Sequence, residues 1–450
     1  MERKRHALLI NPWVYDFSYF DLWAKPLGLL YIASILRENR FEISFIDAMD
    51  IHHPELNLYN RKPLKRRSDG RGEFFWTYAK KPLQLSSIPR RYRRFGIPED
   101  LFIRELESLR RPEIVLVTSG MTYWYQGVIE TISIVKKAFP GIPVVLGGIY
   151  ATLCYDHAVK QSGADYVVKG YGEIAIARII RETLKIDLDF TPDPFLPDTL
   201  PYPAFDLLRK IDYIALITSR GCPFRCSYCS SGILFPSFRR RSPENVLKEI
   251  LYWHNRFGVV DFAFYDDALL VNADEYVAPL LREIIHRNLN LRFHCPNGLH
   301  IRFIDEEIAR LLYLSGFKTI RLGFEVKGDY WHEREDGKVT ESEFIRCIKN
   351  LKKAGYNRDE IGVYIMCGLP GQEPDDVLDT AEFVHACGAK PMLAEYSPIP
   401  ETEMWKRAVE ASPFPIEEEP LFHNKSILCC RKSGWDTDVI RELKKKIRGL

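Results

Sequence analysis

The sequence predicts an α/β protein built from two successive parallel-sheet units. Apolar runs typical of buried strands alternate with amphipathic helix patterns along most of the 450 residues, and a proline-rich stretch near residue 200 divides the alternation. We expect a doubly wound parallel sheet over 1–190, a linker over 191–212, a partial six-unit β/α barrel over 213–400 and a C-terminal extension over 401–450. The composition, 46% hydrophobic and 28% charged, is ordinary for a globular protein.

The first unit is predicted from five apolar runs with helix patterns between most of them, such as 26–39 and 125–139. The strands are expected at residues 7–11, 42–47, 113–119, 142–148 and 165–170. Glycines follow three of these strands, at Gly120, Gly147, Gly148, Gly170 and Gly172. In such sheets ligands bind at the carboxyl ends of the strands, where glycine lets the backbone come close. Tight turns would explain the same glycines equally well.

Residues 61–96 interrupt this pattern with a basic segment rich in aromatic residues. The segment holds twelve Lys or Arg and two Asp or Glu, a net charge of +10, whereas the whole chain carries only +2. Its cations are interleaved with aromatic side chains, namely Phe74, Phe75, Trp76, Tyr78, Tyr92 and Phe95. Such a pattern fits a nucleic-acid or phosphate surface. We favour an extended surface insertion whose aromatics pack on the body of the protein, and we do not expect nucleic acid as a partner.

The second unit begins after five prolines between residues 192 and 203, which predict an ordered, extended linker. The alternation then resumes six times. Strands are expected at 213–219, 259–266, 291–296, 319–325, 361–367 and 391–397, and helices near 243–257, 274–288, 305–315, 341–354 and 374–387. In a parallel β/α barrel, function lies at the carboxyl ends of the strands. The tail carries one further helix pattern, near 437–448.

Three cysteines follow the first barrel strand with the spacing C-x3-C-x2-C, at Cys222, Cys226 and Cys229. The basic N-terminus is followed by only a short apolar run, so we expect no signal peptide, no transmembrane segment and a reducing cytoplasmic location. Structural zinc usually needs four ligands in paired C-x2-C units, and a nucleophilic cysteine needs one thiol and a base. A 4Fe–4S cluster held by three thiolates explains the count and leaves one iron open to a small chelating ligand.

This stretch resembles the signature of the radical S-adenosylmethionine (SAM) family, C-x3-C-x-aromatic-C, in which Tyr228 takes the aromatic place. The resemblance implies that the open iron chelates the amino and carboxylate groups of SAM. It also implies that the reduced cluster cleaves SAM to a 5′-deoxyadenosyl radical, with a reductant such as flavodoxin or ferredoxin as the partner.

Other strand ends agree with the family pattern. Asp266 and Asp267, in the FYDD run, would face the methionine ammonium, unless one of them caps the following helix. Asn297 stands where a ribose contact is expected, although a turn-forming Asn-Gly pair would look the same. Glu325 ends the fourth strand, where the family commonly has an acidic SAM contact.

The last two strand ends complete the resemblance. The MCGLPG run at 366–371 matches the glycine-rich segment beside the adenine and supplies Gly368, Pro370 and Gly371. The run at 395–405 is close to the family's S-P-x-P-G-T, but Glu401 replaces the glycine, which leaves the local turn undecided. The other seven cysteines are more simply read as small buried hydrophobes than as ligands of an auxiliary cluster.

The N-terminal unit resembles the cobalamin-binding-type domain that precedes many radical enzymes of this family. The pieces that carry the resemblance include NPW, VTSGMTYW, LGGIYATL and GADYVVKGYGE. It implies cobalamin at the strand ends, although some family members have a domain that is empty. The candidate cobalamin contacts are Asn11, Pro12, Thr118, Ser119, Gly147, Gly148, Gly170 and Glu173.

One departure concerns the cobalt ligand. The D-x-H-x-x-G motif is absent from the first loop, and its nearest match, at His52, follows the second strand, so no histidine from that motif is expected on cobalt. Trp13, Tyr15 and Phe17 of the first loop would either cover the corrin ring or fill the pocket themselves.

The leading hypothesis is a radical SAM enzyme acting on an unactivated C–H bond, with C-methylation through cobalamin as one form of that chemistry. Non-methylating cyclisation or coupling with an empty cobalamin-type domain, RNA modification, and a non-enzymatic iron–sulfur or cobalamin sensor are the alternatives. RNA modification ranks low because the methylthiolating relatives carry a second cysteine triplet in the first domain, where this chain has only Cys154. No residue identifies the substrate.

Overall fold

The computed structural model describes residues 4–59, 62–328, 339–430, 435 and 437–450. The chain divides into two compact units, Met1–Asp212 and Tyr213–Leu450. The boundary falls at the end of the proline-rich stretch.

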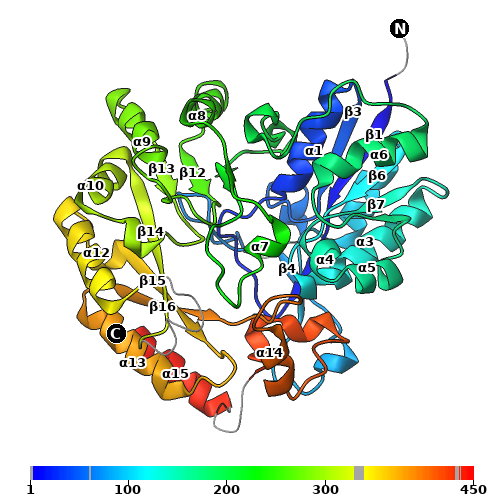
Figure 1. Cartoon of the computed structure of the whole chain (residues 1–450). Helices are drawn as coiled ribbons and strands as arrows, with labels where there is room; N and C mark the ends of the chain where they lie inside the picture. The colour runs from blue at the N-terminus through cyan, green and yellow to red at the C-terminus, as the bar shows by residue number, and fades with distance from the viewer. Residues whose placement is uncertain (1–3, 60–61, 329–338, 431–434, 436) are drawn as a thin grey trace. The chain divides into compact units, whose positions relative to one another are not determined.

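The first unit is built on a five-stranded parallel sheet in the order β3-β1-β6-β7-β8 (Figure 1). Its strands are β1 (His6–Asn11), β3 (Glu42–Asp47), β6 (Ile114–Val117), β7 (Val144–Leu146) and β8 (Tyr166–Val167). Its helices are α1 (Leu27–Glu38), α2 (Glu99–Ser108), α3 (Tyr125–Ala138), α4 (Ile149–Leu153), α5 (Tyr155–Gln161) and α6 (Gly172–Leu184). The strand order reverses between β1 and β6, which is the switch point at which such sheets bind ligands. The predicted doubly wound sheet is confirmed.

Alternating side chains of the strands separate the two faces of this sheet. Ala7 and Leu9 of β1 point to one face and join a buried cluster with Ile35 of α1 and Ile176 and Ile180 of α6. Helices α1 and α6 therefore cover this face, and the amphipathic pattern of α1 follows from that burial.

The basic insertion forms a second, smaller sheet with the loop that follows β1. Strands β2 (Val14–Asp16), β5 (Arg93–Phe95) and β4 (Trp76–Tyr78) pair antiparallel in that order. Four of the six aromatic side chains singled out from the sequence are buried, while Trp76 is 37% exposed and Tyr78 is 56% exposed. The insertion packs most of its aromatics on the body of the unit, and the remaining two lie on β4 at the edge of this sheet. The buried ones are Phe74, Phe75, Tyr92 and Phe95.

The second unit has a six-stranded parallel sheet in the order β16-β15-β14-β13-β12-β9, which is the chain order of a β/α barrel left open. Its strands are β9 (Ile214–Leu216), β12 (Asp261–Phe264), β13 (Arg292–His294), β14 (Phe317–Glu325), β15 (Ile361–Cys367) and β16 (Lys390–Glu395). Helices follow one another along the outside of the strands (Figure 1), namely α8 (Pro243–Phe257), α9 (Val277–His286), α10 (Glu306–Ser315), α12 (Glu341–Ala354) and α13 (Pro374–Ala386). The predicted partial barrel is confirmed.

Local sequence fixes the ends of several barrel helices. The side chain of Ser242 accepts a hydrogen bond from the backbone N–H of Asn245 at the start of α8, and Gly258 ends that helix with a φ of +67°. Asp305 caps α10 in the same way, and Thr340 forms a capping box with Glu343 at the start of α12. The tail adds α14 (Trp405–Ala411) and α15 (Thr437–Gly449).

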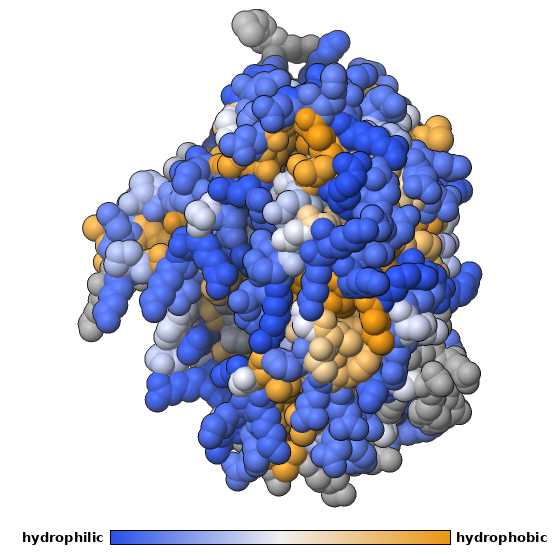
Figure 2. Space-filling view, turned by 90° about the vertical axis from the view of Figure 1, so that its left-hand side faces the viewer, coloured by the Kyte–Doolittle hydropathy of each residue, from blue (hydrophilic) through white to orange (hydrophobic). Residues whose placement is uncertain are grey.

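Figure 2 shows a face of the molecule on which hydrophilic residues predominate and apolar residues form separate patches. In the part of the chain that the structure describes, no helix is both long and apolar enough to cross a membrane.

Candidate functional site

The cysteine loop follows the first strand of the barrel, β9, and its two ends are paired with each other. Strand β10 (Ser219–Arg220) pairs antiparallel with β11 (Arg239–Arg240), so the residues between them form a loop whose two ends are tied together. Gly221 opens the loop with a φ of +77°, and a Cβ there would lie 2.9 Å from the carbonyl oxygens of Phe235 and Ser237. Only glycine fits this position without a backbone shift.

The three thiols differ in their surroundings. None is in a disulfide; Cys226 is buried, Cys222 is half-buried and Cys229 is exposed. The backbone N–H of Ser231 donates to Cys229 Sγ over 3.4 Å, and His300 Nε2 lies 3.9 Å from Cys222 Sγ. Within the described residues, no three or more His, Cys, Asp or Glu side chains are grouped closely enough to hold a metal ion. The fit to an iron–sulfur cluster therefore rests on the donor chemistry, three thiols in one closed loop.

Asp266, at the end of β12, is a buried anchor for the strand that carries the cysteine loop. Its carboxylate accepts hydrogen bonds from the backbone N–H and hydroxyl of Thr218 and from the hydroxyl of Ser219, at 2.6 to 3.2 Å. Burial raises the pKa of Asp266 to about 6, although these hydrogen bonds act in the opposite direction. The side chain is 3% exposed and fully engaged, so it is a structural group of the site.

Asp267 points to the cysteine loop instead. Its Oδ2 accepts a hydrogen bond of 2.6 Å from the hydroxyl of Ser231, the first residue of α7 (Ser231–Leu234). The expectation that one of the two aspartates caps the following helix is wrong. Helix α9 begins only at Val277, with Tyr276 at its N-cap. The two carboxylates instead accept hydrogen bonds from Thr218, Ser219 and Ser231.

The ends of β13 and β14 come together closely. The amide of Asn297 donates to the carbonyl of Tyr265 over 2.8 Å, and Gly298, with a φ of +89°, is the turn residue that the Asn-Gly pair predicts. A Cβ on Gly298 would lie 3.5 Å from the backbone nitrogen of Gly323, and one on Gly323 would lie 2.8 Å from Glu325 Oε1. The carboxylate of Glu325 therefore lies over a glycine at the strand end.

Glu325 has a left-handed backbone, with a φ of +66°. Such a conformation costs a glutamate about 1 kcal/mol and is found most often where function requires it. Glu401 also has a φ of +66°, so the residue that replaces the family's glycine keeps the backbone conformation that glycine favours.

The glycine-rich run after β15 is held by a residue that sequence reasoning missed. Gln372 accepts hydrogen bonds from the backbone N–H groups of Gly368 and Leu369 and donates to the carbonyl of Met366. Gly368 and Gly371 both have positive φ, and the carbonyl of Pro370 accepts from Arg407. No local pattern distinguishes Gln372 from an exposed glutamine, because its partners become apparent only when the loop has closed.

The carboxyl edge of the first unit's sheet combines occupied hydroxyls with open glycines. The hydroxyl of Ser119 donates to the carbonyl of Gly147 over 2.6 Å, and Asn11 donates to Asp47 over 2.7 Å. A Cβ on Gly147 or Gly170 would meet no heavy atom within 4 Å, which is the open space that a ring or its tail requires. Gly148, in contrast, is tightly packed against Ser119.

Other predicted cobalamin contacts lie at the same edge. Thr118 directly follows β6, Pro12 directly follows β1, and Gly170 lies two residues before the first residue of α6. Glu173 is buried in the first turn of α6. This edge of the sheet has space for a bulky ligand beside Gly147 and Gly170. The side chains of Ser119 and Asn11 at the same edge already form hydrogen bonds within the protein.

The bulky residues of the first loop pack into the unit itself. Trp13 is 1% exposed, donates to the carbonyl of Ile97, and packs against Phe102 of α2, with the ring centroids 4.5 Å apart and the ring planes tilted by 50°. Phe17 is likewise buried, and Tyr15 donates to Glu130. Of the two predicted arrangements, these contacts favour side chains that fill space between the small sheet and α2 and α3.

The histidines of the nearest D-x-H match contact carboxylates of the protein. His52 Nε2 lies 2.5 Å from Asp212, and His53 Nε2 lies 3.2 Å from Glu105. Burial lowers the pKa of His53, which favours its neutral imidazole.

Comparison with known families identifies both units. Residues 216–384 match the model of the radical SAM superfamily, and residues 91–180 match the B12 binding domain. The first match spans the cysteine loop and the strands from β12 to β15, and the second spans β6 to β8.

Three curated relatives have similar sequences. An uncharacterised methyltransferase, PH0819, of Pyrococcus horikoshii is 25% identical over 70% of this chain and 74% of its own length. An anaerobic magnesium-protoporphyrin IX monomethyl ester cyclase of Synechocystis is 26% identical over 57% of each chain. The cytidylyl-2-hydroxyethylphosphonate methyltransferase of Streptomyces wedmorensis is 21% identical over 99% of this chain and 89% of its own length.

Two solved structures share the fold. The radical SAM methyltransferase TsrM of Kitasatospora setae, with cobalamin and a [4Fe-4S] cluster bound, matches with a TM-score of 0.66 at 17% identity, over 92% of this chain and 76% of TsrM. The cobalamin-dependent radical enzyme OxsB, with aqua-cobalamin bound, matches with a TM-score of 0.60 at 14% identity, over 99% of this chain and 61% of OxsB.

These matches agree with the two resemblances found in the sequence. A radical SAM core implies a 4Fe–4S cluster and SAM as cofactors, and a B12-binding domain points to cobalamin. The chain thus belongs to the radical SAM superfamily, and it carries a B12-binding domain ahead of its radical SAM core.

Proposed function

We propose that this chain is a cobalamin-dependent radical SAM enzyme that transfers a methyl group to an unactivated carbon. The observation that carries the proposal is the end-to-end likeness to the Streptomyces wedmorensis methyltransferase, which covers 99% of this chain. The relative from Pyrococcus horikoshii, at 25% identity, is also named as a methyltransferase. Both relatives are distant, so the substrate is left open.

The residues of the barrel have separate roles in this proposal. Cys222, Cys226 and Cys229 hold the cluster, which supplies the electron that cleaves SAM. The carboxylate of Glu325, set over Gly323 by a left-handed backbone, accepts hydrogen bonds from polar groups of SAM. Asn297 holds the backbone at Tyr265 in place.

Other groups shape the site without contacting the reacting atoms. Asp266 and Asp267 tie the end of β12 to the cysteine segment through Thr218 and Ser231. Gly368, Pro370 and Gly371 form the wall beside the adenine, and Gln372 fixes its shape. In the first unit, Gly147 and Gly170 leave room for cobalamin, which carries the methyl group in transit.

The test is a product analysis of anaerobically reconstituted protein, with and without hydroxocobalamin. A methyltransferase should retain cobalamin through gel filtration and, only when cobalamin and a strong reductant are present, should form S-adenosylhomocysteine from the SAM that donates the methyl group. It should also form 5′-deoxyadenosine, from a second SAM whose radical removes the hydrogen of the C–H bond. Glu325→Ala should weaken SAM binding while the iron content stays at the wild-type level. Loss of iron in that variant would assign Glu325 a structural role.

A second function is favoured by the cyclase relative, at 26% identity over 57% of each chain. A non-methylating radical enzyme would form 5′-deoxyadenosine without S-adenosylhomocysteine, and its first unit would not retain cobalamin. A protein that binds SAM and forms neither product would be a sensor.

A further inference from the structure

The small sheet of the first unit ends in an open edge. In the pair of β4 and β5, Gly96 donates to the carbonyl of Phe75, and Ala79 donates to the carbonyl of Tyr92. Because backbone groups alternate sides along an antiparallel strand, the N–H and C=O groups of Trp76 and Tyr78 point away from β5. Strand β4 is last in the order β2-β5-β4, so these groups face outward from the sheet.

One face beside this edge combines exposed aromatic rings with arginines. The Trp76 and Tyr78 rings lie 5.1 Å apart, with the guanidinium of Arg93 at 4.1 Å from the Trp76 ring centroid. Arg91 lies 5.3 Å from the Tyr78 ring and donates to its hydroxyl. Both guanidinium groups are thereby held on the same side of the sheet.

The charge of this surface is not neutralised within the described residues. Arg66, Arg71 and Arg94 of the insertion pair with carboxylates, but six other cations of the insertion form no such ion pair in the described part of the chain. Arg93 Nε is buried without a hydrogen-bond partner there. These cations are Lys62, Lys65, Arg67, Lys80, Arg91 and Arg93.

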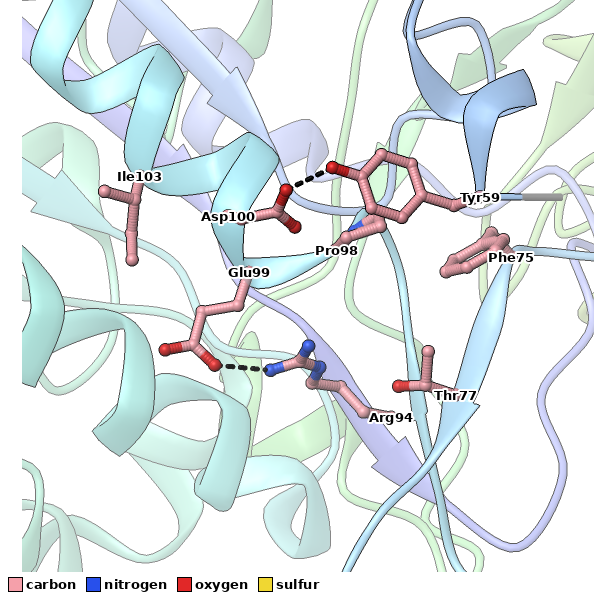
Figure 3. A pocket seen from close by; sticks show the side chains of 8 residues that line it. All are labelled: Tyr59, Phe75, Thr77, Arg94, Pro98, Glu99, Asp100 and Ile103. Carbon is pink, nitrogen blue, oxygen red and sulfur yellow. Dashed lines mark hydrogen bonds and ion pairs between the residues drawn. The ribbon is translucent and has the colours of Figure 1, made fainter.

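The opposite face beside the same edge holds a pocket of about 540 Å³. Figure 3 shows Thr77 on β4 and Phe75 just before this strand on one side of the pocket, and Ile103 on the opposite side. Its charged groups are matched, since Arg94 pairs with Glu99 at 3.2 Å and Asp100 pairs with Arg104 at 2.9 Å. The rest of its lining is largely apolar, so it suits an uncharged side chain.

We propose that the edge of β4 binds an extended acidic segment of a partner polypeptide as an added strand. In such a strand successive side chains point to opposite faces. Acidic side chains on one face would meet Arg91 and Arg93, and an apolar side chain on the other face would enter the pocket beside Thr77. The open backbone groups of Trp76 and Tyr78 supply the hydrogen bonds that this mode of recognition uses. The occupant is therefore acidic and apolar at alternating positions.

The probe for this proposal is a set of fluorescein-labelled nine-residue peptides with glutamate at every second position and Val, Leu, Phe or Ser between them. Anisotropy with the full-length chain should show saturable binding for at least one peptide. N-methylation of the same peptide at alternate residues keeps its charge but removes backbone donors, and it should weaken binding at least tenfold. Binding that survives N-methylation would overturn strand addition.

Two variants test the surface itself. Arg91→Glu/Arg93→Glu should weaken peptide binding at least tenfold, whereas Lys137→Glu/Lys160→Glu, which reverses two exposed cations elsewhere in the unit, should leave it unchanged. Circular dichroism of each variant should match wild type. The proposal is overturned if no peptide binds, which would make the cations a guard against edge-to-edge aggregation. It is also overturned if single-stranded RNA of equal length binds and competes better than every peptide.

Discussion

Replacement of Asp266 by asparagine should remove one step from the pH dependence of stability. Burial raises the pKa of Asp266 from 3.8 to about 6 in the folded protein. A shift of about 2 pH units corresponds to about 3 kcal/mol, at 1.36 kcal/mol per unit. Since the folded pKa lies above the unfolded one, the folded state holds this proton more tightly. The contribution to stability is complete below about pH 4 and is lost as the pH rises toward and past 6.

Asparagine is suited to this test because it keeps most of the network. Oδ1 of Asp266 accepts three of the four hydrogen bonds, from Thr218 N, Thr218 Oγ1 and Ser219 Oγ. An amide oxygen in the same place retains them and cannot titrate. The variant should therefore fold, and the difference between its unfolding free energy and that of wild type should change by about 2–2.5 kcal/mol between pH 4 and pH 7, most of the full 3 kcal/mol.

The assay is urea denaturation followed by circular dichroism at half-unit pH steps, with equal cofactor content in both proteins. Asp274→Asn, which removes an exposed carboxylate of the same unit, is the matched control and should leave the pH dependence as in wild type. A free-energy difference between wild type and Asp266→Asn that stays constant from pH 4 to pH 7 would refute the reasoning. It would mean that the buried carboxyl does not titrate in this range.

Three further predictions concern the cysteine loop and its support. Gly221→Ala should destabilise the loop by about 2–3 kcal/mol, because a positive φ and two contacts at 2.9 Å both penalise a Cβ, and reconstituted iron per chain should fall. Arg241→Met should cost about 3–5 kcal/mol in thermal or urea unfolding, since it leaves the fully buried carboxylate of Glu249 without its ion pair, and an unchanged melting temperature would contradict this. Replacing Cys222, Cys226 and Cys229 together by alanine should abolish the brown colour of anaerobically purified protein, and iron that persists would reveal a second cluster.

The fold could be predicted because its strands are buried on both faces and its helices on one. Continuous apolar runs marked β1, β6 and β7, whereas barrel strands such as β14 and β16 also contain charged residues. The alternation of strand and helix patterns predicted the parallel arrangement. The antiparallel sheet of β2, β5 and β4 gave no such signal. Its strands have three residues each, which is too short for a period of two to show in the sequence. In addition, β2 pairs with β5 across 77 to 81 positions of sequence.

The candidate site was predictable where chemistry depends on residue type and not where it depends on packing. The cysteine spacing and Glu325 could be recognised from residue type and position alone, because both match the family pattern. The roles of Asp266 and Gln372 could not be recognised in this way. An aspartate that follows a strand can equally be a helix cap, and the sequence does not show which backbone groups a glutamine will bind. Only the parallel register that places Phe264 beside Leu216 brings Asp266 to Thr218.

Because β10 pairs with β11, the register of the barrel strands does not depend on the number of residues in the cysteine loop. Residues 219–220 pair with residues 239–240. A change of length in the loop between them therefore need not change the register of β9 in the barrel sheet. The entropic cost of closing a loop grows only with the logarithm of its length, about 0.6 kcal/mol for each doubling. Ser231 is bound to Asp267, and the carbonyls of Phe235 and Ser237 lie against Gly221. A change of length between Ser231 and Phe238 should therefore displace the cysteines while the barrel strands keep their register.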